Sequence, residues 1–130
     1  MPKKITVVDD EPYHRKAVKL LLEGEGFEVG TAQDWQECLD KLEKERPDLI
    51  LLDILMPGMN GWEVCKRIKE INKDQKVIFL TAVGVTKSEL LSAVSQKLHV
   101  QRIKEIGAVG YITKPFDNED LIRRVKRALG

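Results

Sequence analysis

Polar and charged side chains follow four of the five short apolar runs in this 130-residue chain. They are Asp9 and Asp10 after the first run, Asp53 after the third, Thr81 after the fourth and Lys114 after the fifth. Carboxylate oxygens without histidine or cysteine are the ligands that Mg²⁺ or Mn²⁺ prefers. A lysine ammonium and a hydroxyl beside such a centre can neutralise the oxygens of a phosphoryl group. If the chain brings these residues together, their types indicate phosphoryl-transfer chemistry.

Each of these residues alone has an ordinary structural explanation. An acidic pair before a helix usually caps that helix, and an aspartate after an apolar strand usually begins a turn. A threonine at a strand end usually packs or turns, and a single lysine is usually solvated. The combination is different, because three carboxylates that meet at one edge repel one another unless a cation joins them.

The elements that position these residues are visible in the hydrophobic pattern. Apolar runs typical of strands cover Ile5–Val8, Phe27–Ala32, Leu49–Leu52, Val77–Leu80 and Tyr111–Thr113. Between them lie apolar stripes with helical spacing, which begin at Ala17, Trp35, Val64 and Leu121. Repeated alternation of strand and helix predicts an α/β domain over residues 1–130, with a parallel sheet covered by helices on both faces.

The strand compositions also indicate the order of the sheet. The first, third and fourth runs are almost uniformly apolar, as central strands are, whereas the second carries Glu28 and the fifth is short. This pattern favours a doubly wound, five-stranded sheet in the order 2-1-3-4-5. Its winding reverses between strands one and three, where ligands bind at the carboxyl ends, so Asp10 and Asp53 should flank that crevice.

Capping residues mark the expected helix ends. An N-cap acceptor is followed three residues later by a carboxylate in the pairs Asp34 and Glu37, Asn60 and Glu63, Thr86 and Glu89, and Asp117 and Asp120. Pro12 suits a first helical turn. Glycines stand where helices can end at Gly24, Gly107 and Gly130.

Composition excludes several classes of protein. Twenty-two Lys and Arg against 21 Asp and Glu leave a net charge of +1, which argues against a nucleic-acid binder. The basic cluster within Arg123–Arg127 lies on the outside of an amphipathic stripe, so we interpret it as a solvated face. No apolar run approaches the ~20 residues that a membrane span needs.

Cys38 and Cys65 lack metal-site spacing, and we expect reduced thiols in a cytoplasmic protein. His14 and His99 are isolated, and we expect surface or packing roles for both.

Four motifs together resemble the response-regulator receiver domain of two-component signal transduction, in its chemotaxis-regulator-like, single-domain form. They are Val7–Pro12, Pro47–Gly61, Leu80–Ala82 and Tyr111–Phe116, and they occur in the family's order over nearly the whole chain. The resemblance implies a flavodoxin-like fold and a phosphorylatable signalling switch rather than a turnover enzyme. Its implied partners are a sensor histidine kinase, or a small phosphodonor, and a downstream protein bound at the face of the fourth helix and fifth strand. It implies no contact with nucleic acid or membrane.

The resemblance also assigns the acidic residues. Asp53 is then the phosphoacceptor, whose carboxylate attacks a phosphoryl group to form an acyl phosphate. Asp10, Asp53 and the backbone carbonyl of Leu55 are the implied ligands of Mg²⁺, with Mn²⁺ as a substitute. Asp9 would act through water or as a neighbouring acid.

Three further matched residues have implied roles. Lys114 would pair with the phosphoryl oxygens, and Thr81 would hydrogen-bond one of them. Tyr111 is the aromatic switch residue, whose ring moves inward as Thr81 shifts toward the phosphoryl group. The Lys114–Pro115 peptide is predicted to be cis, because the strand must turn at once for Lys114 to point over the crevice.

The chain departs from the family pattern at two places. Leu55 and Val83 are apolar where many members carry polar side chains that position a hydrolytic water, so we expect slow dephosphorylation. The segment between Thr81 and Lys114 is also longer than usual, which predicts an extended fourth-helix region. Its capping box and its lack of proline and glycine over 88–106 favour a bent helix, or two helices that meet near Leu98–Gln101.

Two other classes of protein compete with this interpretation. A Mg²⁺-dependent phosphatase of the haloacid dehalogenase type also uses an aspartate nucleophile, a lysine and a hydroxyl. That family places Asp-x-Asp after its first strand, whereas here the acids are adjacent and the isolated Asp53 follows the third strand. The other class is a receiver-like interaction module that is never phosphorylated. It is disfavoured because the five strand-end residues of the family pattern are all present: Asp9, Asp10, Asp53, Thr81 and Lys114.

Overall fold

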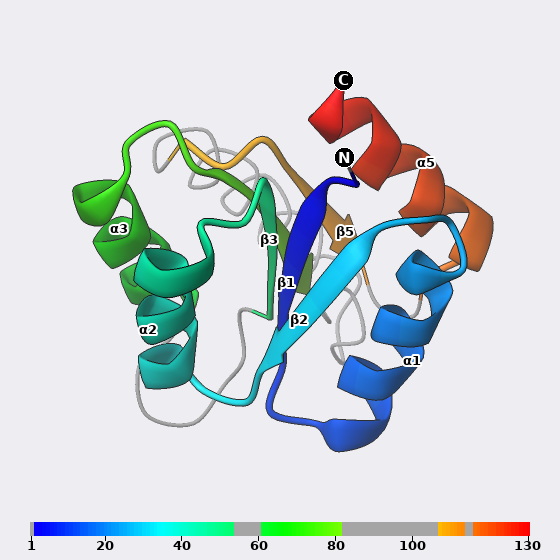
Figure 1. Cartoon of the computed structure of the whole chain (residues 1–130), viewed down its shortest axis with the longest axis horizontal. Helices are drawn as coiled ribbons and strands as arrows, with labels where there is room; N and C mark the ends of the chain where they lie inside the picture. The colour runs from blue at the N-terminus through cyan, green and yellow to red at the C-terminus, as the bar shows by residue number, and fades with distance from the viewer. Residues whose placement is uncertain (1, 54–60, 82–106, 114–115) are drawn as a thin grey trace, which may run out of the picture.

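The computed structural model describes residues 2–53, 61–81, 107–113 and 116–130 (Figure 1). Along the chain the elements are β1 (Lys4–Val8), α1 (Pro12–Glu23), β2 (Glu28–Ala32), α2 (Trp35–Glu45), β3 (Leu49–Asp53), α3 (Gly61–Ile71), β4 (Lys76–Thr81), β5 (Gly110–Thr113) and α5 (Asn118–Leu129). The predicted α/β class with a parallel sheet is confirmed. The predicted helix in the 86–106 region and the Lys114–Pro115 peptide lie outside the described residues.

The strands lie in the order β2-β1-β3-β4-β5, and every neighbouring pair is parallel. All five residues of β3 are buried, as expected for a strand with a neighbour on each side and helices over both faces. The register aligns Val8 with Leu52 and Asp53 with Leu80. The carboxyl ends of β1, β3 and β4 therefore meet at one edge of the sheet.

Alternating strand residues build two hydrophobic cores, one on each face of the sheet. Leu49 and Leu51 of β3 face α1 and α5, in a core with Val18, Leu22, Leu121 and Val125. Ile50 and Leu52 face α2 and α3, in a core with Cys38, Leu42, Val64 and Ile68. Figure 1 shows this division, with α2 and α3 on one side of the sheet and α1 and α5 on the other. The two cores hold the sheet edge that carries the acidic residues in place.

The helix starts match the predicted caps in part. Asp34 Oδ1 accepts a hydrogen bond of 2.8 Å from the Glu37 amide, as predicted. Asp117 also caps α5, but its side chain accepts from the Glu119 amide at 3.1 Å. The Asn60 and Thr86 caps lie outside the described residues.

The structure also shows which residues cap the start of α1 and the C-terminal ends of α1 and α2. Pro12 occupies the first turn as predicted, and Glu11 is the N-cap of α1. Gly24 is the C-cap of α1, as predicted, with a right-handed φ of −62°, and the left-handed turn comes two residues later at Gly26, with φ 91°. The α2 helix ends at Arg46, a non-glycine residue with φ 48°.

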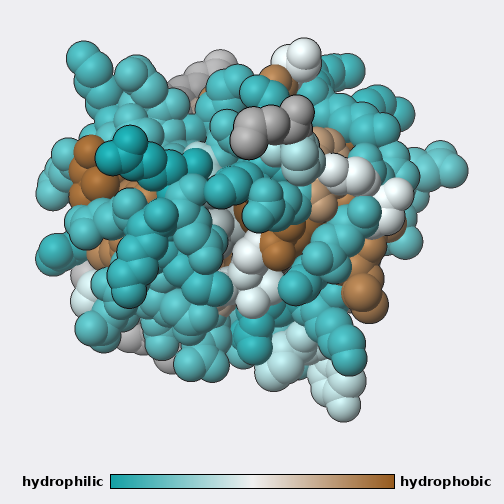
Figure 2. Space-filling view, in the orientation of Figure 1, coloured by the Kyte–Doolittle hydropathy of each residue, from teal (hydrophilic) through white to brown (hydrophobic). Residues whose placement is uncertain are grey.

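The surface of the described residues is mainly hydrophilic. Figure 2 shows small separate apolar areas over α1 and α3, and the exposed large apolar residues include Tyr13, Leu20 and Ile71. The basic face of α5 is engaged in surface ion pairs: Arg123 and Arg124 contact Asp120, and Lys126 contacts Glu25. Among the described residues, no helix has the length and apolar character needed to cross a lipid bilayer.

Candidate functional site

The site lies where β1 and β3 end side by side. Asp9 directly follows Val8, which pairs with Leu52 in the parallel register, and Asp53 directly follows Leu52. The carboxylates therefore project from adjacent strand ends, at the point where the winding of the sheet reverses.

Three carboxylates meet at this point. One oxygen each from Asp9, Asp10 and Asp53 can be chosen so that all three lie within 4.8 Å of one another. Asp9 and Asp53 are buried, with 1% and 7% of their surface exposed, whereas Asp10 is exposed. The donors are all hard oxygen atoms with room for solvent on the Asp10 side, which suits Mg²⁺, a cation that keeps several waters. The residues present therefore fit a divalent-cation site.

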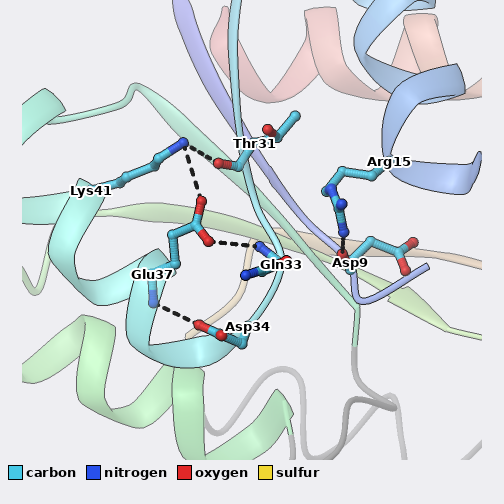
Figure 3. Close-up of polar contacts among 7 residues, drawn as sticks. All are labelled: Asp9, Arg15, Thr31, Gln33, Asp34, Glu37 and Lys41. Atoms are coloured by element: carbon cyan, nitrogen blue, oxygen red, sulfur yellow. Dashed lines mark hydrogen bonds and ion pairs between the residues drawn. The ribbon is translucent and has the colours of Figure 1, made fainter. Parts of the chain in front are cut away.

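Asp9 is held by hydrogen bonds on its amide, its carbonyl and its carboxylate. Its amide donates to the Ala32 carbonyl at 3.1 Å, continuing the pairing of β1 with β2. Its Oδ1 accepts from the Glu11 amide at 2.9 Å, and its carbonyl accepts from Arg15 Nη1 at 2.6 Å. Figure 3 shows the Arg15 guanidinium at the main chain of Asp9, with the Asp9 carboxylate directed away from that contact. Asp9 is thus a rigidly oriented member of the cluster.

The end of β2, whose Ala32 carbonyl accepts from the Asp9 amide, is anchored by side chains of α2. Lys41 Nζ donates to the Thr31 carbonyl and lies 3.6 Å from Glu37 Oε1 (Figure 3). The other carboxylate oxygen of Glu37 accepts from the Gln33 amide at 3.5 Å. This network fixes the edge strand beside the site, although none of its side chains joins the acidic cluster.

Two residues near the site were not predicted. Arg15 binds the Asp9 carbonyl, and His14 Nδ1 lies 3.9 Å from Asp9 Oδ2. His14 is exposed, as expected, but it borders the acidic cluster as well. Both residues lie in the first turns of α1, which starts at the site, so the short spacing from Asp9 was the available signal.

The other predicted site residues are located only in part. The backbone of Thr81 ends β4 opposite Thr113, and the backbone of Tyr111 lies in β5 opposite Phe79. The side chains of Thr81 and Tyr111 are not among the described groups. Three more predicted positions lie outside the described residues: Leu55, Val83 and Lys114. The structure thus brings together Asp9, Asp10 and Asp53 from the predicted set.

A doubly wound parallel sheet with carboxylates at its β1–β3 crevice defines an α/β protein with an acidic cluster at the switch point. The protein-family model of the response regulator receiver domain matches residues 5–126, so the chain belongs to this family. Receiver domains are signalling switches rather than turnover enzymes, and they bind Mg²⁺ at an acidic pocket.

Solved structures agree with this assignment. The chemotaxis protein CheY4 of Vibrio cholerae is 33% identical, with a TM-score of 0.83 over 98% of this chain and 99% of its own. A putative response regulator from Chloroflexus aurantiacus is 33% identical, with a TM-score of 0.84 over 99% of this chain and 98% of its own. The BeF3-activated receiver domain of DrrB, from Thermotoga maritima, is 33% identical, with a TM-score of 0.80 over 99% of this chain and 98% of its own.

Proposed function

We propose that residues 1–130 form one receiver domain that accepts a phosphoryl group on Asp53 and thereby switches a downstream partner. The observation that supports this most directly is the position of Asp53. It closes the fully buried strand β3, retains 7% exposure, and lies beside Asp9 and Asp10. A carboxylate in that place can reach an incoming phosphoryl group while its strand keeps it in a constant orientation.

The proposed reaction forms one bond and breaks one. A carboxylate oxygen of Asp53 attacks phosphorus, and the bond from phosphorus to the leaving group breaks with its electron pair on the leaving group. That leaving group is the imidazole nitrogen of a sensor histidine kinase, or the acetate oxygen of acetyl phosphate. Dephosphorylation is the attack of water on phosphorus, which returns the Asp53 carboxylate and releases inorganic phosphate.

The ligands proposed for Mg²⁺, or for Mn²⁺ as a substitute, are Asp10, Asp53 and the backbone carbonyl of Leu55. A bound Mg²⁺ would supply positive charge to neutralise the phosphoryl oxygens. Asp9 would act through water or as a neighbouring acid, and its 1% exposure and hydrogen bond from Glu11 suit a fixed supporting position.

The remaining roles follow from the family motifs. Lys114 would pair with the phosphoryl oxygens, Thr81 would hydrogen-bond one of them, and Tyr111 would change position with Thr81. The β4–β5 register, in which Thr81 and Tyr111 belong to neighbouring strands, supports communication between the two. The partner surface would be the face of the fourth helix and β5, and the protein would act in the cytoplasm without binding nucleic acid.

Small-molecule phosphorylation tests this proposal. The chain is incubated with acetyl phosphate and MgCl₂, and its intact mass is measured. We expect one added phosphoryl group on the parent chain, none on Asp53→Asn, and none on the parent chain in excess EDTA. Asp40→Asn is the matched control, because it removes an exposed carboxylate from α2, outside the cluster. Equal labelling of Asp53→Asn and the parent chain would contradict the proposal.

A further inference from the structure

Arg15 makes an unusual contact for a cation beside an acidic cluster. Its Nη1 donates to the Asp9 main-chain carbonyl at 2.6 Å, a length typical of a charge-assisted hydrogen bond. Within the part of the chain that the structure describes, no carboxylate forms an ion pair with Arg15. The guanidinium therefore binds the backbone of the site rather than a carboxylate of the cluster.

The carbonyl that Arg15 binds belongs to the peptide that joins Asp9 to Asp10. Because a peptide unit is planar, holding its oxygen also orients the bond that leads to the Asp10 Cα. Asp10 needs this support more than Asp9 does. It is exposed, it lies outside regular secondary structure, and its side chain makes no hydrogen bond or ion pair with the described residues. Arg15 restrains the Asp9–Asp10 peptide directly, through the carbonyl oxygen of Asp9.

We propose that Arg15 is a positioning residue for divalent-cation binding, which acts by holding the Asp9–Asp10 peptide so that the Asp10 carboxylate stays in the cluster. This inference rests on the proposed function, because it concerns the same site. It extends that function to a residue that touches neither the phosphoryl group nor the cation. Groups that orient metal ligands from outside typically change metal affinity by roughly 10- to 100-fold.

The sign of the effect separates positioning from simple electrostatics. A nearby cation repels Mg²⁺, so removal of the Arg15 charge should strengthen Mg²⁺ binding if charge is its only contribution. If Arg15 positions Asp10, its removal should weaken binding in spite of the lost repulsion. The two explanations therefore predict opposite changes in the same dissociation constant.

Isothermal titration calorimetry with MgCl₂ on the unphosphorylated chain measures that constant. We expect Arg15→Met to bind Mg²⁺ about tenfold more weakly than the parent chain, with Arg15→Lys between the two because its ammonium can still donate to the carbonyl. Lys16→Met is the matched control, since it removes an exposed cation from the next position of α1. We expect it to bind as tightly as the parent chain, or slightly more tightly.

Circular dichroism and thermal unfolding in EDTA show whether each variant is folded. If Arg15→Met does not fold, the comparison is made with Arg15→Gln, whose shorter amide loses the contact but keeps a polar side chain. Weaker Mg²⁺ binding by a folded variant supports the inference, and unchanged or tighter binding overturns it. If the parent chain binds Mg²⁺ and is phosphorylated while Arg15→Met binds equally well, only this inference fails. If the parent chain binds no Mg²⁺, the proposed metal site and this inference fail together.

Discussion

Replacing Asp10 with asparagine should stabilise the chain without Mg²⁺ and destabilise it, relative to the parent chain, with Mg²⁺. Asp10 is the member of the cluster whose side chain makes no hydrogen bond or ion pair with the described residues, so the change removes charge without breaking a known contact. The asparagine is nearly the same size and remains exposed to solvent, as Asp10 is. The main effect should therefore be the loss of repulsion from Asp9 and Asp53.

The magnitude follows from the cluster geometry. Two unit charges 4.8 Å apart repel by about 0.9 kcal/mol at the dielectric constant of water. That constant is appropriate for the exposed Asp10, and two such pairs give about 1.7 kcal/mol. Salt screening lowers this value, so we expect Asp10→Asn to gain about 1 kcal/mol in the free energy of unfolding, which corresponds to about 4 °C in melting temperature.

Mg²⁺ should reverse this order. When its concentration is 100 times the dissociation constant, a bound cation adds about 2.7 kcal/mol to the stability of the parent chain. Asp10→Asn loses a ligand and should gain little from the same addition. Thermal unfolding in EDTA and in MgCl₂, at low and high NaCl, measures both effects, with Asp40→Asn as the control. A melting temperature for Asp10→Asn at or below that of Asp40→Asn in EDTA would refute the repulsion argument.

Three further predictions concern the thiols and the departures from the family pattern. Burial raises the pKa of Cys38 to about 12 and that of Cys65 to about 11. Because these thiols stay protonated in the folded state, their contribution to stability is complete below pH 9 and is lost as pH rises toward 11 to 12. Urea unfolding across that range should show a smaller loss for Cys38→Ala, and an equal loss would contradict the burial argument. A Leu55→Asn, Val83→Glu double variant should lose its phosphoryl group faster than the parent chain, as followed by intact mass; equal rates would show that water positioning is not the cause. Hydrogen exchange over 86–98 should be slow and should respond to beryllofluoride, whereas exchange like that of an unfolded chain would count against a helix there.

The acidic cluster could be predicted because strand ends are visible in the sequence. Each carboxylate follows an apolar run, and the parallel topology brings neighbouring ends to one edge. No knowledge of side-chain direction was needed for Asp9, Asp10 and Asp53 to be grouped. The boundaries of the three central strands, β1, β3 and β4, were predicted within one residue because burial on both faces makes these runs nearly continuous in apolar residues.

Features that depend on helix phase or on local backbone angles were not predictable in this way. The Arg15 side chain reaches the Asp9 carbonyl only because α1 starts at Pro12 and its first turns lie beside the strand end. The left-handed residue after α1 is Gly26, two residues beyond the C-cap Gly24, and the left-handed C-cap of α2 is Arg46, with no glycine to signal it. Tertiary context decides such ends, and residue type is only a weak indicator.

The central claim is that Asp53 carries the phosphoryl group and that the acidic cluster makes this reaction depend on Mg²⁺. The most direct test is to label the chain with acetyl phosphate in MgCl₂, reduce the acyl phosphate with borohydride, and locate the reduced residue by peptide mass spectrometry. The account predicts reduction at Asp53 alone and no reduced residue when EDTA replaces MgCl₂. Reduction at another carboxylate, or equal labelling of Asp53 in EDTA, would contradict it.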